Sequence, residues 1–432
     1  MSEKEFSNQS FPSGNKGKVT IVGGGIIGLS SAFYLQKSGW DVTVLDKGDF
    51  TDSCGYGSAG YICPSHFVPL ATPGIVKKGF NWMWNSKSPF YVQPRLDWSL
   101  ISWGLKFIKS AKKENVEAAA IPLRDIAILS KAEYESWLKI PGFDFAYQQK
   151  GLLEIYQTEE YAEHAKHMYE KALSLGLNET RLIGKEELKT LEPQTNVNAI
   201  GGLLFNCDAH CYPDKLMGSL IAYLKEKGVK LIPHQEVIQF EKRNGAVTKI
   251  MTTSNEYEPD EIVLATGSWG MATAKLLDLK TPIIPGRGYS VTYENSPYKF
   301  NYPTVLMEGR VAITPMDGNK IRFGGTMEIT SHKTPIRMNR VQGILDALKR
   351  FYPEYDVPLP PKEKVWYGYR PCSADGLPFI GRSSKQSNVT VATGHSMLGL
   401  SLGAGTGKLV DELVNKKATT MDLKPFSVER FR

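Results

Sequence analysis

The chain has 432 residues, a formal net charge of +7 at pH 7 and a composition that is 41% hydrophobic and 22% charged. A chain of this length is too long for one hydrophobic core and is predicted to form two or three structural units. Its composition is ordinary for a soluble globular protein. No apolar run is long enough to span a bilayer, and the five irregularly spaced cysteines exclude a disulfide scaffold and indicate a reducing compartment.

The chain begins with a polar stretch, residues 1–17, which is rich in Ser, Asn, Gly and Lys. It lacks the apolar core of a signal peptide and is therefore predicted to be a disordered lead-in. Together with the cysteine pattern, this predicts a cytoplasmic protein.

A dinucleotide-binding βαβ unit is predicted next. An apolar strand at 18–22 runs into Gly23-Gly24-Gly25-Ile26-Ile27-Gly28, a helical pattern follows, and the next apolar strand ends at Asp46. Gly23 allows the tight turn, Gly25 the approach of backbone to a pyrophosphate, and Gly28 the close packing of helix on strand. The pyrophosphate sits at the helix N-terminus, and the Asp46 carboxylate accepts hydrogen bonds from the ribose. This unit alone does not distinguish NAD from FAD.

The rest of the chain alternates helical and strand patterns. Helices are predicted near 96–111, 122–139, 159–175, 214–227, 339–350 and, after a glycine-rich turn at 394–407, at 408–414. Strands are predicted at 41–45, 152–156, 202–204, 229–233, 289–293, 304–307, 311–315, 320–326 and 389–392. A further apolar strand starts at Glu261 and ends in Thr266-Gly267, which is typical of a parallel strand that returns beside the first one. The alternating strands between 289 and 330 predict an inserted antiparallel sheet that would form a wall of a substrate cavity.

Residues 61–113 form a basic and aromatic window. It holds eight basic residues against one acid, and four of the eight tryptophans of the chain. In its predicted helix, Leu96, Leu100, Trp103 and Phe107 fall on one side. Two interpretations remain open: the aromatic side chains pack inward with a solvated rim of lysines, which is slightly favoured, or the window contacts an anionic membrane surface.

Histidine and cysteine do not form a convincing metal site. Cys207-Asp-Ala-His-Cys211 places three possible zinc ligands together, but no second Cys/His pair supplies the fourth. No metal is therefore predicted. The other histidines without a partner at useful spacing are interpreted as surface or packing residues, namely His66, His164, His167, His234 and His332.

Further motifs follow in order along nearly the whole chain. They are 57–64, 71–74, 151–156, 208–213, 263–269, 286–290, 322–329, Trp366-Tyr-Gly-Tyr-Arg-Pro371, Asp375-Gly-Leu-Pro-Phe-Ile-Gly381 and Gly394-His-Ser-Met-Leu-Gly-Leu400. Together with the first βαβ unit they resemble the D-amino acid oxidase-like family of FAD-dependent oxidoreductases, and most closely its bacterial D-amino acid dehydrogenases.

The resemblance implies an α/β fold, in which a Rossmann-type FAD-binding domain carries an inserted substrate domain of an antiparallel sheet plus helices. The expected FAD-binding domain comprises 18–64, 200–285 and 366–415, the substrate domain comprises 65–199 and 286–365, and 416–432 is a C-terminal tail. The resemblance also implies FAD rather than NAD. The expected FAD contacts are Gly23, Gly25, Gly28 and Asp46 at the adenosine half, Val237 at the adenine, Thr266 and Gly267 beneath the diphosphate, Ser58, Ala59 and Gly60 at the reactive ring edge, and Gly399 and Leu400 at the pyrimidine end.

The resemblance also implies two residues that would contact the substrate. Arg370 would bind a carboxylate in bidentate fashion, so that Cα–H points at the flavin N5. Tyr289 is a second candidate anchor through its hydroxyl, at equal odds with plain sheet packing. Cys372 lies near the position where sarcosine-oxidase-type relatives attach flavin covalently, but its offset from Asp375 differs, so non-covalent FAD is expected.

The implied function is the oxidation of a D-amino acid or cyclic imino acid by hydride transfer from Cα to N5. Electrons would pass to a quinone or another respiratory-chain acceptor, with peripheral contact to the inner face of the membrane as an open alternative to a purely cytoplasmic location. An oxygen-using amine oxidase of the glycine or sarcosine type, and a non-catalytic flavin-binding subunit, remain alternatives. The sequence indicates no nucleic acid partner, and it leaves the substrate, its stereochemistry and the oligomeric state open.

Overall fold

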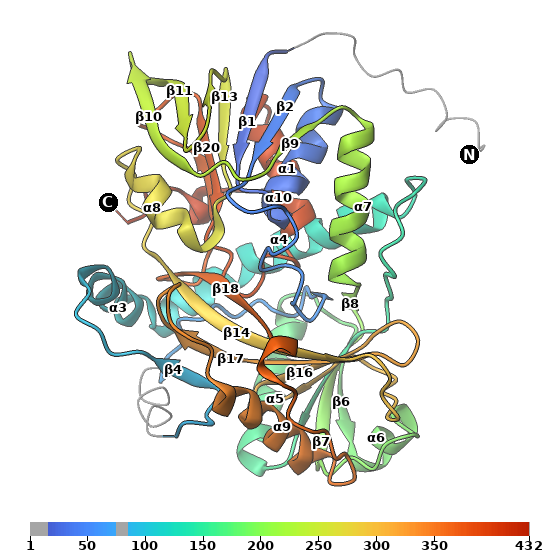
Figure 1. The fold of residues 1–432 in the computed structure, drawn as a ribbon. Helices are drawn as coiled ribbons and strands as arrows, with labels where there is room; N and C mark the ends of the chain where they lie inside the picture. The colour runs from blue at the N-terminus through green and yellow to red at the C-terminus, as the bar shows by residue number, and fades with distance from the viewer. Residues whose placement is uncertain (1–15, 75–84, 432) are drawn as a thin grey trace.

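The computed structural model describes residues 16–74 and 85–431 and arranges them around two large sheets (Figure 1). A six-stranded sheet has the order β19-β20-β13-β1-β2-β9, and a nine-stranded sheet has the order β18-β14-β17-β16-β15-β5-β7-β6 with β4 paired to β17. Figure 1 shows the first sheet in the upper half and the second in the lower half. The predicted α/β class is confirmed, because a parallel nucleotide-binding sheet lies beside a largely antiparallel one.

The six-stranded sheet carries the predicted βαβ unit. Its strands are β1 (Lys18–Val22), β2 (Asp41–Leu45), β9 (Lys230–Ile232), β13 (Glu261–Leu264), β19 (Phe379–Arg382) and β20 (Val389–Thr393). β1 pairs in parallel with both β2 and β13, and β20 pairs in parallel with β13. The apolar strand that ends before Thr266 therefore does return beside the first strand.

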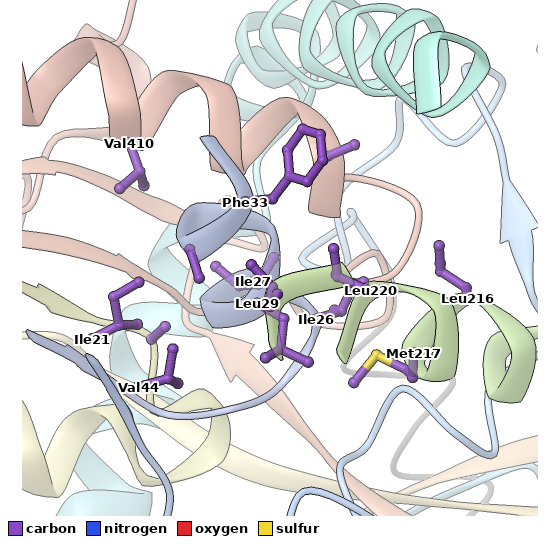
Figure 2. Packing of buried hydrophobic residues seen from close by; sticks show 14 of the residues in the cluster. Ile21, Ile26, Ile27, Leu29, Phe33, Val44, Leu216, Met217, Leu220 and Val410 are labelled. Atoms are coloured by element: carbon purple, nitrogen blue, oxygen red, sulfur yellow. The ribbon is translucent and has the colours of Figure 1, made fainter. Parts of the chain in front are cut away.

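Helix α1 (Ile26–Lys37) lies at the centre of the core beside this sheet. It contacts α7 (Pro213–Glu226) and α10 (Gly403–Val414), and most of its residues are buried. Figure 2 shows side chains from the sheet and from all three helices meeting there, among them Ile21, Val44, Leu29, Phe33, Leu220 and Val410. The apolar pattern of α1 on all sides is explained by this position between sheet and helices.

Two glycines allow the turn between β1 and α1 to be compact. Gly23 has a φ of +110°, which side chains other than that of glycine rarely tolerate. A Cβ atom on Gly28 would collide with the carbonyl oxygen of Gly23. Gly28 thus has the packing role that its place in the glycine pattern predicts.

Gly28→Ala is expected to lower the free energy of unfolding by about 1–3 kcal/mol, because the added methyl group meets backbone that cannot move aside. The matched control is Gly218→Ala in α7, where an added Cβ meets no atom within 4 Å. The control should be neutral or stabilising by up to about 1 kcal/mol, since alanine favours a helix over glycine. Urea unfolding of both variants measures the difference, and equal stabilities would contradict the packing role.

The nine-stranded sheet forms the second domain, with its own helices. Its strands are β4 (Phe90–Val92), β5 (Leu152–Tyr156), β6 (Thr180–Gly184), β7 (Gly201–Phe205), β14 (Ile283–Tyr293), β15 (Thr304–Leu306), β16 (Val311–Pro315), β17 (Ile321–Ile329) and β18 (Trp366–Ser373). Its helices are α5 (Glu159–Ser174), α6 (Lys185–Leu191) and α9 (Met338–Phe351). A turn at Asp317-Gly318 joins β16 to β17, which pair in antiparallel fashion.

Smaller elements complete the fold. They are β3 (Tyr61–Ile62) paired with β8 (Ala209–His210), the three-stranded sheet of β10 (Val237–Arg243), β11 (Ala246–Thr252) and β12 (Glu256–Tyr257), helices α3 (Trp98–Ser110), α4 (Lys113–Trp137) and α8 (Gly270–Lys275), and the 3₁₀ turns η1 (Gly267–Trp269), η2 (Lys362–Lys364) and η3 (Lys424–Phe426). The sequence does not predict the three-stranded sheet.

Helix α10 begins earlier than the sequence predicts. The prediction places a glycine-rich turn up to 407, whereas the helix starts at Gly403. A Cβ at Gly405 would lie 2.9 Å from the backbone nitrogen of Ser130 in α4, and one at Gly407 would lie 2.6 Å from the carbonyl group of Ser30 in α1. These glycines therefore form a helix face that two neighbouring helices approach closely, although glycine composition alone indicates a turn.

Three segments lie beside elements of the other expected domain. β7 and β18 are strands of the nine-stranded sheet, although they fall within the ranges 200–285 and 366–415 assigned to the nucleotide-binding domain. Helix α4, expected in the substrate domain and to begin at 122, begins at Lys113 and contacts α10. The chain crosses several times between the two sheets without a change in composition, so the sequence does not mark the crossings. Of the expected lead-in, residues 1–15 lie outside the described residues.

Helix α3 has two apolar faces. Trp103 and Phe107 are buried on one face, as the inward-packing interpretation expects, whereas Leu96 precedes the helix and is fully exposed. On the other face large apolar side chains are exposed, namely Trp98, Ile101, Leu105 and Ile108. The window residues Lys77, Lys78, Trp82 and Trp84 lie outside the described residues. Within 16–74 and 85–431, the structure contains no helix with the length and hydrophobicity needed to cross a membrane.

Candidate active site

A cavity of about 1400 Å³ is lined by residues of both domains. It extends from the turn after β1 to strands β17 and β18. Among its lining residues are all the predicted cofactor contacts except Gly28, together with Arg370 and Tyr289: Gly23, Gly25, Asp46, Ser58, Ala59, Gly60, Val237, Thr266, Gly267, Gly399 and Leu400. Tertiary structure thus brings residues from distant parts of the chain into one space.

At one end of the cavity, the first turn of α1 is open to a ligand. No side chain caps this helix, and a Cβ added at Gly25 would meet only Ser53, at 4.0 Å. The protein itself therefore does not require glycine at this position, whereas a pyrophosphate resting on the helix N-terminus does. The carboxylate of Asp46 is fixed nearby, since it accepts hydrogen bonds from the backbone N–H of Gly24 at 2.5 Å and of Gly48 at 2.7 Å.

Unpartnered polar groups around the cavity fit a dinucleotide such as the expected FAD. The buried hydroxyls of Ser53, Thr266 and Ser396 have no hydrogen-bond partner within the described part of the chain, and all three residues line the cavity. At the other end, α10 also lacks a side-chain cap, and Leu400 lies just before its N-terminus. A ligand with several acceptor oxygens would satisfy these donors.

A stack of three side chains joins the two domains beside the cavity. The ammonium of Lys47 lies 3.3 Å from the ring centroid of Trp269, which stacks on His332 at 4.3 Å. Ser268 Oγ lies 2.9 Å from Nε2 of this histidine, and burial lowers the pKa of His332 to about 4. His332, interpreted from sequence as a surface or packing residue, therefore lines the cavity as an uncharged ring.

Arg370 presents a cation to the cavity without a carboxylate partner. It lies on β18, and its guanidinium rests where a side chain on Gly288 would collide with it. Its Nη1 donates to the carbonyl oxygen of Thr326, and burial lowers its pKa. No ion pair involving Arg370 occurs among residues 16–74 and 85–431. Because an arginine stays charged even when buried, this site favours an incoming carboxylate.

The backbone next to Arg370 is irregular. Between the pairs Arg287–Glu328 and Tyr289–Gly325, β17 carries one extra residue opposite β14. Thr326 in this bulge has a φ of +68°, which is rare and strained for a β-branched residue. The bulge turns the carbonyl group of Thr326 toward Arg370, and bulges of this kind are frequent beside active sites.

The hydroxyl of Tyr289 takes part in a buried hydrogen-bond network. Its hydroxyl donates to Glu328 Oε2 at 2.9 Å and accepts from the backbone N–H of Arg337 at 3.0 Å. Arg287 pairs with the same carboxylate at 2.7 Å, and both charged side chains are fully buried. Since the hydroxyl hydrogen of Tyr289 is used within the protein, the geometry favours the packing interpretation, and the anchor role stays a prediction.

The structure brings together a polar group that the sequence does not reveal. His66, which follows β3, lines the cavity, and Ser65 beside it is hydrogen-bonded both to His66 and to Asp208, which precedes β8. The ligand atoms of Cys63, His66 and Asp208 lie within 4.8 Å of one another. Within the described ranges, the side chains of Cys207, His210 and Cys211 do not form such a cluster. The cluster of possible ligand atoms therefore lies at His66 and not at the Cys207–Cys211 motif.

Comparisons with known proteins show the family of the chain. A family model described as FAD dependent oxidoreductase matches residues 18–413. A Helicobacter pylori protein named D-amino acid dehydrogenase is 29% identical over 402 residues, which cover 92% of this chain and 95% of that protein. A Vibrio atlanticus protein of the same name is 29% identical over 426 residues, covering 96% of this chain and 100% of the relative.

Solved structures share the fold. Glycine oxidase from Geobacillus kaustophilus superimposes with a TM-score of 0.75 at 22% identity, covering 96% of this chain and 100% of that one. L-proline dehydrogenase from P. horikoshii superimposes with a TM-score of 0.70 at 21% identity, covering 96% of this chain and 98% of that one. At sequence identities of 22% and 21%, the similarity of these two structures to this chain shows that the three proteins share a fold.

Proposed function

The chain belongs to the FAD dependent oxidoreductase family, and from that premise we propose that it is a D-amino acid dehydrogenase that acts on an amino or cyclic imino acid. Relatives that carry this name align over nearly the full length. The observation that carries the proposal is the unpaired guanidinium of Arg370 in a cavity that fits FAD. A free amino acid supplies the carboxylate that this group lacks.

FAD, when bound, supplies the acceptor for the hydride that leaves Cα. The turn after β1 and Asp46 would hold its adenosine half, and the segment Ser58–Gly60 together with Gly399 would hold its ring end. Arg370 would fix the substrate carboxylate through two parallel hydrogen bonds, which orients Cα–H and removes rotational freedom before reaction. Phe90 and Met327 line the cavity and add an apolar wall that excludes water.

An oxygen-using amine oxidase is the second candidate, since glycine oxidase shares the fold. The two functions differ in the electron acceptor that reoxidises the flavin. A non-catalytic flavin-binding subunit is disfavoured, because such a protein has no use for an unpaired arginine in the cavity.

Substrate and acceptor are tested together. The purified protein is expected to be yellow, to release FAD on acid precipitation, and to reduce an artificial dye with members of a panel of D-amino acids and cyclic imino acids. Oxygen uptake with the same substrates should be much slower than dye reduction. Stoichiometric hydrogen peroxide would instead identify an oxidase, and the absence of any turnover across D- and L-panels would contradict the proposed function.

Delivery of electrons to a membrane quinone would require contact with the bilayer, and α3 supports this part of the proposal. Its outer face exposes Trp98 to 83% and Leu105 to 66%. Lys109 in the last turn of α3 is exposed, as are Lys112 and Lys113 at the start of α4, which follows directly. Apolar residues flanked by lysines are typical of helices that lie in the interface of an anionic membrane.

Leu105→Glu is expected to abolish binding to vesicles that contain anionic lipid, because it places a carboxylate in the apolar face of α3. Wild-type protein should sediment with these vesicles at low salt and less at high salt, since the Lys–lipid attraction is screened. Leu182→Glu on β6, which replaces another exposed leucine, is the matched control and should bind as the wild type does. Absence of wild-type binding at low salt would contradict the membrane contact.

A further inference from the structure

We propose that His66, linked through Ser65 to Asp208, is the base that takes the proton from the ammonium group of the bound amino acid. The inference rests on the proposed function, because it requires an amino acid in the cavity. It adds a catalytic residue, His66, and two positioning residues, Ser65 and Asp208, to the carboxylate site at Arg370.

The three side chains form a continuous hydrogen-bonded chain. Nδ1 of His66 lies 3.2 Å from Ser65 Oγ, and this hydroxyl lies 2.5 Å from Oδ2 of Asp208. The backbone N–H of Ser65 also donates to Oδ1 of Asp208, at 3.1 Å. The two contacts from one serine fix the carboxylate relative to the histidine.

This geometry selects one tautomer of His66. With Asp208 ionised, the hydroxyl hydrogen of Ser65 is donated to the carboxylate, so Ser65 Oγ can only accept from the ring. Nδ1 of His66 therefore carries the hydrogen, and Nε2 carries the lone pair. A base needs this lone pair to be directed at the substrate.

The His66 side chain lines the cavity, and its neighbours Ser65 and Phe67 are buried. Because Nδ1 is turned to Ser65, we infer that Nε2 is the ring nitrogen that a ligand in the cavity would meet. Nε2 of His66 has no hydrogen-bond partner among residues 16–74 and 85–431. Burial lowers the pKa of His66 to about 4, so the ring is uncharged at neutral pH and can pass a proton on but does not retain it.

Asp208 can hold the proton that arrives. Burial raises the pKa of this carboxyl to about 6, against hydrogen bonds from Ser65 and from the thiols of Cys63 and Cys207 that lower it. The other ionisable groups close to Asp208 are Glu154, whose pKa burial raises to about 7, and Tyr147, and Arg310 lies next to Glu154.

The chemistry requires such a group. An amino acid reaches the protein as an ammonium ion, whose nitrogen has no lone pair with which to form the C=N bond of the product. In the proposed transfer, the ammonium proton passes to Nε2 of His66, the Nδ1 proton passes to Ser65 Oγ, and the serine proton passes to Asp208. The substrate becomes a neutral amine, Asp208 becomes neutral, and no other reactant is needed.

The pH dependence distinguishes this relay from uptake of neutral amine. Without the relay, kcat/KM follows the fraction of free amine and rises about tenfold per pH unit up to the amine pKa. With the relay, kcat/KM has a plateau that begins near the pKa of Asp208, about 6, and below it falls as this carboxyl becomes protonated. The wild type is expected to show the plateau.

In the His66→Gln variant, kcat/KM is expected to rise about tenfold per pH unit instead of reaching a plateau. Its kcat/KM should therefore be at least tenfold below that of the wild type at neutral pH and equal to it above the amine pKa. An amino acid whose amine pKa lies below neutral should show no deficit at neutral pH. Ser65→Ala, which retains the ring but breaks its link to Asp208, should show the same profile. His164→Gln, on the outer face of α5, is the matched control and should retain the wild-type profile.

Flavin absorbance and its perturbation by a simple aliphatic carboxylate verify that FAD and the Arg370 site are intact in each variant. If the kcat/KM of His66→Gln is reduced equally at neutral and at high pH, the relay is wrong. It is also wrong if the wild-type kcat/KM rises tenfold per pH unit. Either result would leave the proposed function standing. If the wild type oxidises no amino acid at any pH, the proposed function fails and the relay fails with it.

Discussion

Arg370→Ala is expected to lower kcat/KM for the amino acid by roughly 10²–10⁴-fold while FAD stays bound. Hydrogen bonds to charged groups contribute about 1.5–3 kcal/mol each, and the variant loses two of them. Each loss of about 1.4 kcal/mol in transition-state binding is a factor of ten in rate. The effect should be large because the guanidinium is held in place by the carbonyl group of Thr326 and has no carboxylate partner of its own in the described structure.

Two further variants make the Arg370 experiment specific. Arg370→Lys keeps the charge but loses the planar pair of donors, so its kcat/KM should fall between those of the wild type and Arg370→Ala. Arg181→Ala removes an exposed arginine that pairs with Glu187 on the surface and should leave kcat/KM unchanged. Dye-reduction kinetics and flavin absorbance provide the readout, and near-normal kcat/KM for Arg370→Ala would place the substrate carboxylate elsewhere.

Glu328→Ala is expected to lower the free energy of unfolding by about 3–5 kcal/mol, because it leaves a buried charge without its partner. Arg287 and Glu328 are both fully buried and lie 2.7 Å apart. The same carboxylate accepts from Tyr289, and Nε of Arg337 lies 3.0 Å from its other oxygen. One substitution therefore disturbs three partners beside the bulge that positions Arg370.

Urea unfolding of three comparison variants tests this explanation. Glu328→Gln keeps the shape and should cost less than Glu328→Ala. The double variant Arg287→Met/Glu328→Leu removes both charges and should recover most of the lost stability. Glu294→Ala breaks an exposed ion pair with Lys320 and should cost less than about 1 kcal/mol. A similarly small cost for Glu328→Ala would show that the buried network does not support the site.

The sequence by itself determined the first βαβ unit, whose turn forms one end of the cavity. Gly23, Gly25, Gly28 and Asp46 lie within one βαβ unit, where spacing along the chain fixes spacing in space. A turn of this kind tolerates few other residues, so its pattern is specific. The same locality explains why most helices and strands were predictable, since the periodicity of apolar residues is a property of one segment.

Only the tertiary structure decided which distant residues meet. The glycines of α10 belong to a helix because α1 and α4 press against them, and a composition rule that favours turns cannot include those neighbours. Likewise His66 and Asp208 are 142 positions apart and join through Ser65 because the segments after β3 and before β8 lie side by side. Local patterns record the chemistry of adjacent residues, whereas contacts of this kind depend on how the two sheets pack, and that arrangement is set by the sum of many buried contacts along the whole chain.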